Sequence, residues 1–381
     1  MSSDLDETIL ASVGVDQDPA QGAVMPPIYL SSNYSFDGFG GKRAYDYGRS
    51  GNPTRDILAH ALAALERGAG AVVTSSGMAA VDLVLSPLPA GAFVVAPHDC
   101  YGGTWRLLDA RARKGQIEVA FVDQSDSDAL GEALARKPAL VLIETPSNPL
   151  MRVVDIEAIA KRAKAAGAKV AADNTFLSPI LQKPLQLGAD FVIHSTTKYL
   201  NGHSDVVGGA VVAADASELE QLKWWANCTG VTGAPFDSWL TLRGLRTLSV
   251  RVKQQQRTAA KIAEALAGHG AVSAVYYPGL PTHRDHAIAT RQQAGFGAML
   301  SFDLKGGEAE VRALLSRLKR FTLAESLGGV ETLVAHPASM THAGMGVEAR
   351  ARAGIGETLL RLSIGLEHED DLLADLRRAL G

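Results

Sequence analysis

The sequence predicts an α/β protein in which a large domain with a mostly parallel sheet is followed by a smaller α+β C-terminal domain. Three observations lead to this prediction. Short apolar runs recur between residues 71 and 212, helical patterns separate these runs, and longer helices dominate after about Thr247. With 381 residues, the chain is also longer than one hydrophobic core usually supports, so we expect at least two domains.

The short apolar runs are the expected strands of the sheet. Several contain no polar residue, which is typical of strands covered by helices on both faces. They span residues 71–74, 92–96, 119–122, 139–143, 169–172, 191–193 and 209–212. Between two of them, Ile156, Ile159, Ala160 and Ala163 have the spacing of one helix face, and Gly167 ends that helix. This alternation predicts a doubly wound domain with its site at the carboxyl ends of the strands.

The two ends of the chain differ from its middle. The expected elements of the C-terminal domain are helices at residues 250–268, 309–319 and 368–380 and strands at 272–277 and 298–303. Before about Thr54, glycine and proline are frequent and periodicity is weak, which indicates an arm. We therefore expect an N-terminal arm at residues 1–54, a central domain at 55–247 and the C-terminal domain at 248–381.

Composition favours a soluble protein that acts on a small molecule. Charged residues make up 20% and hydrophobic residues 46% of the chain, and the net charge of -4 gives no general attraction to nucleic acid or anionic membrane. Cys100 and Cys228 are too few for a disulfide framework. We see no signal peptide and no run near the ~18 apolar residues of a membrane span, so we expect a cytoplasmic protein.

Lys198 and Asp173 are the strongest candidates for catalytic chemistry. Each follows an apolar run, so an amine and a carboxylate are expected at the ends of neighbouring strands. Pyridoxal 5'-phosphate (PLP) needs such a pair, because the amine forms a Schiff base and the carboxylate keeps the pyridine nitrogen protonated. Ser195 and Thr197 add hydroxyls beside the lysine. Residues 75–80, small and placed between a strand and a helix, suit a phosphate at a helix N-terminus.

Several further segments carry a resemblance to a known family. They span residues 46–55, 101–106, 144–149, 195–205, 236–238 and 325–329. With these motifs the chain resembles, over nearly its whole length, the PLP-dependent enzymes of cysteine and methionine metabolism. The resemblance implies the fold of PLP-dependent transferases, which is similar to that of aspartate aminotransferase.

The resemblance also implies which residues hold PLP. Lys198 would carry the Schiff base, Asp173 would pair with the pyridinium nitrogen, and Tyr101 would stack on the ring and act near the substrate amine. The residues implied at the cofactor within the same chain also include Gly77, Met78, Thr175, Ser195 and Thr197. Tyr47 and Arg49 would reach the phosphate from a neighbouring subunit, in a homotetramer built from two dimers.

Other residues are implied at the substrate. Arg361 would clamp the α-carboxylate through two hydrogen bonds, with help from Asn148 and Ser326. Those implied at the distal end of the substrate are Asp46, Arg106 and Glu325. The chain departs from the family at Gly48, where serine is common, and we expect this change to loosen the arm loop and to remove a hydroxyl contact.

The implied reaction is γ-replacement, in which cysteine sulfur replaces the acyl group of O-succinyl-homoserine or another O-acyl-homoserine and gives cystathionine for methionine biosynthesis. Residues 224–227, 297–300 and 341–345 resemble this synthase branch of the family more than its γ-lyase branch. A γ-lyase, or a sulfhydrylase that takes free sulfide, is the alternative, and Glu325 counts against a β-lyase. A non-catalytic scaffold with this fold is disfavoured because the residues needed for the chemistry are all present.

The histidines do not predict a metal site. His194 and His203 flank the lysine motif, and His336 and His342 are close together in sequence, but no HExxH or CxxC spacing accompanies them. No GxGxxG follows a strand, which removes the main sequence support for a dinucleotide cofactor. We therefore expect PLP as the cofactor and no metal.

Overall fold

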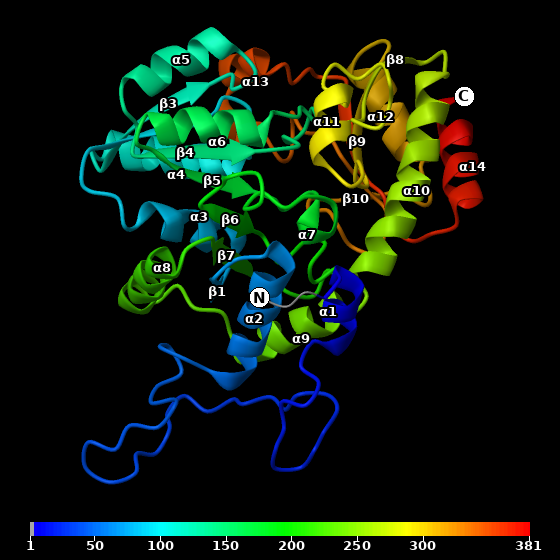
Figure 1. Ribbon diagram of the computed structural model, residues 1–381. Helices are drawn as coiled ribbons and strands as arrows, with labels where there is room; N and C mark the ends of the chain where they lie inside the picture. The colour runs from blue at the N-terminus through cyan, green and yellow to red at the C-terminus, as the bar shows by residue number, and fades with distance from the viewer. Residues whose placement is uncertain (1–3) are drawn as a thin grey trace. The chain divides into compact units, whose positions relative to one another are not determined.

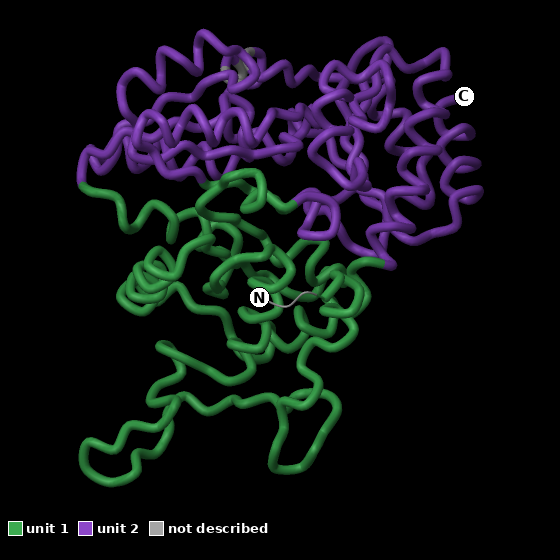
Figure 2. Tube along the Cα trace, viewed as in Figure 1, with its two compact units in different colours: residues 1–89, 171–175, 183–249 green, residues 90–170, 176–182, 250–381 purple. Residues whose placement is uncertain are grey.

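The computed structural model describes residues 4–381, so the first three residues of the predicted arm lie outside it. The chain forms two compact units (Figure 2). Unit 1 consists of Met1–Pro89, Ala171–Thr175 and Lys183–Ser249, and unit 2 consists of Ala90–Val170, Phe176–Gln182 and Val250–Gly381. None of the helices within residues 4–381 is long and apolar enough to cross a membrane.

Four strands form the sheet of unit 1. Their order is β1 (Gly70–Thr74), β7 (Gly209–Ala213), β6 (Phe191–His194) and β5 (Lys169–Asp173). β5 and β6 are parallel, as predicted, whereas β7 runs antiparallel to both β1 and β6. The connection from β6 to β7 contains no crossover helix, so the chain turns back along the sheet. A buried apolar run does not predict this reversal, because buried parallel and antiparallel strands have the same apolar sequence pattern.

Helices cover the strands of unit 1. They are α1 (Asp6–Ser12), α2 (Pro53–Glu66), α3 (Gly77–Leu85), α8 (Ala216–Thr229) and α9 (Pro235–Leu245). α2 begins where Asn52 accepts hydrogen bonds from two backbone N–H groups and Pro53 occupies the first turn. Its buried face contacts β1 and α9. The chain between α1 and α2 runs as a long loop (Figure 1). The helix α1 is too short for its periodicity to predict it.

Unit 2 contains a parallel three-stranded part of the α/β fold. β2 (Ala92–Pro97) lies between β4 (Leu140–Glu144) and β3 (Ile117–Val122) and is parallel to both. The associated helices are α4 (Gly102–Arg113), α5 (Ser127–Ala135), α6 (Ile156–Ala165) and α7 (Ser178–Leu181). The four apolar positions predicted to face the core of α6 are all buried. Gly167, with φ +85°, follows the end of the helix, so the prediction for this helix is confirmed.

The C-terminal part of unit 2 is a second sheet with helices. Its strand order is β10 (Thr322–Leu323), β11 (Leu333–Ala335), β12 (Leu359–Ser363), β9 (Met299–Leu304) and β8 (Val272–Tyr276). Only the short β10–β11 pair is parallel. The helical segments are α10 (Leu248–Ala267), α11 (His286–Gln292), α12 (Glu308–Arg317), η1 (Ala343–Met345), α13 (Val347–Ala353) and α14 (Glu369–Leu380). The predicted α/β class, with an α+β C-terminal part, is confirmed.

Candidate active site

The candidate phosphate site lies where β1 leads into α3. Ser76 caps this helix by accepting a hydrogen bond from the Ala79 N–H at 3.1 Å. A Cβ at position 77 would lie 2.7 Å from Ser195 Cβ, so only glycine lets the helix N-terminus approach Ser195 this closely. A Cβ on Gly209 would lie 2.2 Å from the Ser76 carbonyl oxygen, which fixes the turn from the other side. The N–H groups of Gly77 and Met78 are thus in the first turn, where backbone donors favour an anion.

Asp173 ends β5 and is held by the residues around it. Its carboxylate accepts the Thr175 N–H at 2.9 Å, and Thr175 Oγ1 in turn accepts the Ser195 N–H at 2.9 Å. Burial raises the pKa of Asp173, while hydrogen bonds from Thr175 and the charge of His194 act in the opposite direction. A cationic nitrogen bound beside Asp173 would relieve the cost of burying this carboxylate.

Lys198 lies in the turn that follows β6. The turn is closed by hydrogen bonds from the Lys198 N–H to the Ser195 carbonyl at 3.3 Å and from the Gly202 N–H to the Lys198 carbonyl at 2.8 Å. β5 and β6 are parallel and pair Asp173 with Ile193, so both residues follow neighbouring strand ends, as predicted. Thr197 exchanges hydrogen bonds with Gly208, accepting its N–H at 3.0 Å.

Behind Asp173 lies a buried pair that the sequence analysis missed. His194 Nε2 is 2.7 Å from Glu66 Oε1, and both side chains have no exposed surface. Asn174 Nδ2 donates to the same Glu66 oxygen at 2.9 Å. The sequence gives no signal for this pair, because Glu66 lies on α2, 128 residues before His194 in the chain.

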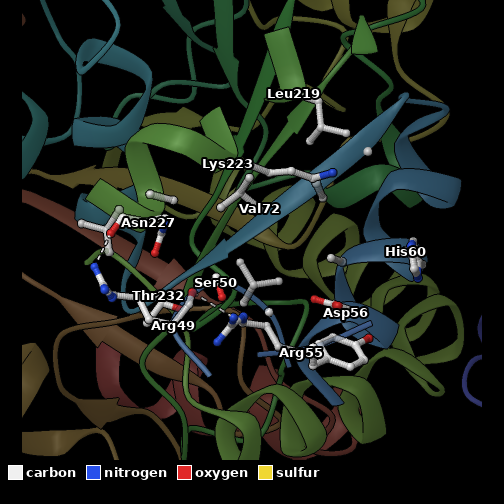
Figure 3. Close-up of a pocket in the computed structure, with 18 of the residues that line it drawn as sticks. Arg49, Ser50, Arg55, Asp56, His60, Val72, Leu219, Lys223, Asn227 and Thr232 are labelled. Carbon is white, nitrogen blue, oxygen red and sulfur yellow. Dashed lines mark hydrogen bonds between the residues drawn. The ribbon is translucent and has the colours of Figure 1, made fainter. Parts of the chain in front are cut away.

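Asp46 and Arg49 of the arm loop line a cavity of about 400 Å³ together with residues of α2, β1 and α8, and Figure 3 shows Arg49 there. Arg49 Nη1 donates to the Asn227 carbonyl at 2.8 Å, and its guanidinium lies 5.6 Å from the centre of the half-exposed Tyr47 ring. Asp46 accepts hydrogen bonds from the Tyr47 N–H at 2.7 Å and Ser50 Oγ at 2.8 Å. The contact with Lys42 and then these two hydrogen bonds lower the pKa of Asp46 to about 2.

Gly48 is not loosely held, contrary to our expectation from its departure from the family. Its N–H donates to the Ser32 carbonyl at 2.7 Å, and its carbonyl accepts Arg55 Nη2 at 2.8 Å. A Cβ at position 48 would lie 3.3 Å from the Ser31 carbonyl oxygen, a tight contact. The backbone, rather than a side-chain hydroxyl, therefore fixes this loop.

Tyr101 and Arg106 belong to the start of α4 in unit 2. Tyr101 precedes the helix, keeps 42% of its surface exposed and donates its N–H to Glu144 Oε2 at 2.8 Å. Arg106 is exposed one turn further along. The other oxygen of Glu144 accepts the Asn148 N–H at 3.3 Å. Glu144 was predicted only as part of a motif, and the structure shows that it connects two candidate site residues.

Arg361 lies on β12 with only 3% of its surface exposed. Its Nη1 donates to Asn148 Oδ1 at 2.9 Å and its Nη2 to the Ser326 carbonyl at 2.8 Å. The structure therefore brings Arg361, Asn148 and Ser326 together as predicted. Glu325, which precedes Ser326, is exposed. Asn148 is held in turn by His342, whose Nε2 is 3.0 Å from the Asn148 carbonyl.

The phosphate turn, Asp173 and Lys198 match the three chemical requirements of PLP. The glycine-dependent approach of α3 to Ser195 suits a phosphate, the carboxylate of the partly buried Asp173 suits a protonated ring nitrogen, and Lys198 follows on the neighbouring strand end. The residues of unit 1 therefore fit this cofactor. Within residues 4–381, no three His, Cys, Asp or Glu side chains gather as metal ligands would, and the expectation of no metal stays a prediction.

Comparison with known proteins agrees with the site. Residues 7–381 match the family described as Cys/Met metabolism PLP-dependent enzyme, and the chain belongs to this family. It is therefore a PLP-dependent enzyme, as the motifs predicted.

Within this family, the chain is similar to individual enzymes that act on cystathionine or form it. The chain is 58% identical to cystathionine γ-synthase of Escherichia coli (strain K12), over 97% of this chain and 96% of that protein. A solved structure of cystathionine γ-synthase from Xanthomonas oryzae pv. oryzae in complex with cystathionine is 61% identical, with a TM-score of 0.98, covering 100% of this chain and 98% of that one. Cystathionine γ-lyase (CalE6) from Micromonospora echinospora is 45% identical with a TM-score of 0.95, covering 99% of each chain.

Proposed function

We propose that the chain catalyses γ-replacement on O-succinyl-homoserine or another O-acyl-homoserine. The sulfur of cysteine forms a bond to Cγ, the acyl group leaves as a carboxylate, and cystathionine is the product, in methionine biosynthesis. One observation carries this proposal: the chain is 61% identical over its whole length to a synthase solved with cystathionine.

The residues of unit 1 are proposed to hold the cofactor. Gly77, Met78, Ser195 and Thr197 would bind the phosphate, Asp173 with Thr175 would hold the ring nitrogen, and Lys198 would hold the cofactor covalently. When bound, PLP supplies an electron sink that stabilises negative charge developing at Cα of the substrate. Asp173 supports this chemistry because its charge keeps the ring nitrogen protonated.

Two side chains are proposed to move protons. Lys198 Nζ would take the proton from Cα of the substrate and later return one, which requires a neutral amine at the working pH. Tyr101 would act near the substrate amine. The hydrogen bond from the Tyr101 N–H to Glu144 fixes the backbone at the start of α4, which gives the Tyr101 ring a defined starting position.

Arg361 is proposed to bind the α-carboxylate of the substrate. A buried guanidinium recognises a carboxylate strongly because the fork of N–H donors matches its two oxygens in a region that excludes water. Asn148 and Ser326 already fix the plane of the fork. We propose Asp46, Arg106 and Glu325 at the distal end of the substrate. In this chain Asp46 also organises its own loop.

The second candidate is γ-elimination from cystathionine, which the 45% identity to a γ-lyase favours. A sulfhydrylase that uses sulfide is the third. The test incubates the purified enzyme with O-succinyl-homoserine with and without cysteine, and separately with cystathionine or sulfide. We expect cystathionine to form fastest in the presence of cysteine. Dominant 2-oxobutyrate release from cystathionine would instead identify a lyase, and faster product formation with sulfide a sulfhydrylase.

We also propose a homotetramer built from two dimers, in which Tyr47 and Arg49 reach the phosphate of the neighbouring subunit. The arm exposes the side chains of Val24, Leu30 and Phe39, and exposed apolar residues grouped in one segment favour contact with another chain. The test mixes inactive Arg49→Ala and inactive Lys198→Ala chains under conditions of subunit exchange. Activity should return, because one site of the hybrid combines an intact arm with an intact lysine. No activity despite verified hybrids would contradict the arm in trans.

The division into an arm at residues 1–54, a PLP-binding domain at 55–247 and a C-terminal domain at 248–381 remains a proposal, as does a cytoplasmic location. The chain has only two cysteines, too few for a disulfide framework, which supports a reducing compartment. Limited proteolysis tests the division, and we expect the first cleavages within the exposed arm.

A further inference from the structure

Arg55 is a buried cation that the chemistry of the site does not use. It lies in the first turn of α2 and keeps 7% of its surface exposed. Burial lowers its pKa, which shows the cost of placing a guanidinium here, although Asp56, Tyr34 and Tyr45 act in the opposite direction. A cation retained in such a place is expected to make bonds that a neutral side chain could not.

The hydrogen bonds of Arg55 go to backbone carbonyls. Nη2 donates to the carbonyl of Gly48 at 2.8 Å and to that of Arg49 at 3.2 Å, and Nη1 donates to the carbonyl of Gly233 at 3.2 Å. Figure 3 shows Arg55 and Arg49 at the same cavity, with Arg49 turned toward Asn227. One guanidinium thus connects the arm loop to the segment just before α9.

The bound carbonyls flank the residues proposed to serve the neighbouring subunit. Gly48 lies between Tyr47 and Arg49, and Arg55 binds the carbonyls of the second and third residues of this run. The other side of the loop is held by the Gly48 N–H bond to the Ser32 carbonyl at 2.7 Å and by the Asp46 carboxylate, which accepts the Tyr47 N–H. The loop is therefore fixed within its own chain.

We propose that Arg55 is a positioning residue that holds Tyr47 and Arg49 in the conformation in which they bind the phosphate of the neighbouring subunit. This inference rests on the proposed arm in trans. A preformed loop avoids the entropy loss of ordering two long side chains and their backbone at the moment of binding. Lysine cannot replace Arg55, because a single ammonium group does not span three carbonyls as the planar guanidinium does.

The test uses subunit mixing with Arg55→Gln chains. In hybrids with Lys198→Ala chains, the intact lysine comes from the Arg55→Gln chain and the arm from the other, so activity should return as in the Arg49→Ala and Lys198→Ala control. In hybrids of Arg55→Gln with Arg49→Ala, both arms are defective, so activity should stay low. If Arg55 serves the site of its own chain, the first pair stays inactive and the second regains activity, which overturns the inference.

A second measurement does not depend on turnover. The dissociation constant of PLP from the apoenzyme should rise by about 10- to 100-fold in Arg55→Gln, the range found for residues that orient metal ligands. The oligomeric state, measured by sedimentation velocity, should stay that of the wild type. Arg55→Lys should also raise the dissociation constant of PLP. If Arg55→Gln does not fold, Arg55→Lys replaces it in both tests.

Wild-type turnover and PLP affinity in both variants would overturn the positioning role. An active wild-type enzyme with an inactive control hybrid would instead overturn the arm in trans, and the inference with it, while leaving the proposed reaction intact. A wild-type enzyme that makes no cystathionine from O-succinyl-homoserine and cysteine would refute the proposed reaction, while the PLP affinities would still decide the role of Arg55.

Discussion

Replacing His342 with glutamine should reduce the loss of stability at acid pH. His342 is buried, its Nε2 lies 3.0 Å from the Asn148 carbonyl, and its Nδ1 lies 2.8 Å from Thr341 Oγ1. A carbonyl only accepts hydrogen bonds, so Nε2 carries the proton and Nδ1 accepts from the hydroxyl of Thr341 in the neutral ring. Glutamine can still donate to the Asn148 carbonyl but does not titrate.

The magnitude follows from the pKa of His342. Burial and, next, the positive charge of Arg361 lower it from 6.5 to about 4, with a smaller contribution from Arg350, while the Asn148 carbonyl acts in the opposite direction. The unfolded chain therefore binds a proton at a higher pH than the folded one, so stability falls as the pH falls from about 6.5 to about 4. The full difference corresponds to about 3 kcal/mol, of which about 2 kcal/mol is lost between pH 7 and pH 4.5.

The assay is urea denaturation of the wild type and of His342→Gln at pH 7 and pH 4.5. The wild type should lose about 2 kcal/mol more of its unfolding free energy than the variant does over this interval. His60→Gln, which replaces an exposed histidine on α2, is the matched control and should behave as the wild type. An equal pH-dependent loss in the wild type and in His342→Gln would refute the assignment of a buried, neutral histidine.

Further outcomes are expected at other positions. Lys198→Ala should abolish turnover and the covalent Schiff-base link to the cofactor while circular dichroism shows a folded chain, and near wild-type turnover would exclude the lysine. Arg361→Lys should lower kcat/KM by about tenfold to ten-thousandfold at saturating PLP, since one or two charge-assisted bonds of roughly 1.5–3 kcal/mol are lost. Arg106→Ala should penalise O-succinyl-homoserine more than O-acetyl-homoserine, which has no second carboxylate, and equal losses would contradict this role. Glu66→Ala should destabilise the fold by about 3–5 kcal/mol, measured by urea denaturation, because it leaves the buried His194 without its partner. A loss below about 1 kcal/mol, as for exposed pairs, would contradict a strong buried contact between Glu66 and His194.

The residues that the sequence could identify are those placed by local rules. Asp173 and Lys198 follow apolar runs, and parallel neighbouring strands bring such ends together, which β5 and β6 confirm. Gly77 opens a helix directly after a strand, where a phosphate is favoured. The burial pattern of α6 also agrees with its 3.6-residue periodicity. Each of these predictions needs only residues within one element or between consecutive elements.

The residues that the sequence could not identify act through distant partners. Glu66 meets His194 across 128 residues, and His342 meets Asn148 across 194. Arg55 binds Gly233 across 178 residues. On a helix, Glu66 and Arg55 are indistinguishable from the solvated charges that helices commonly carry, because nothing within one turn indicates their burial.

This difference has a physical origin. Asp173 and Lys198 stand at accessible ends of strands, so their positions in the chain follow from the pattern of elements. A residue that holds such a group in place is buried, and its polar atoms must be satisfied by whichever backbone or side chain the fold brings near. The bonds of Arg55 to Gly48 and Arg49 are of this second kind. Substitutions of Arg55, Glu66 and His342 therefore test the structure itself, whereas substitutions of Lys198 and Arg361 test chemistry that the motifs already predict.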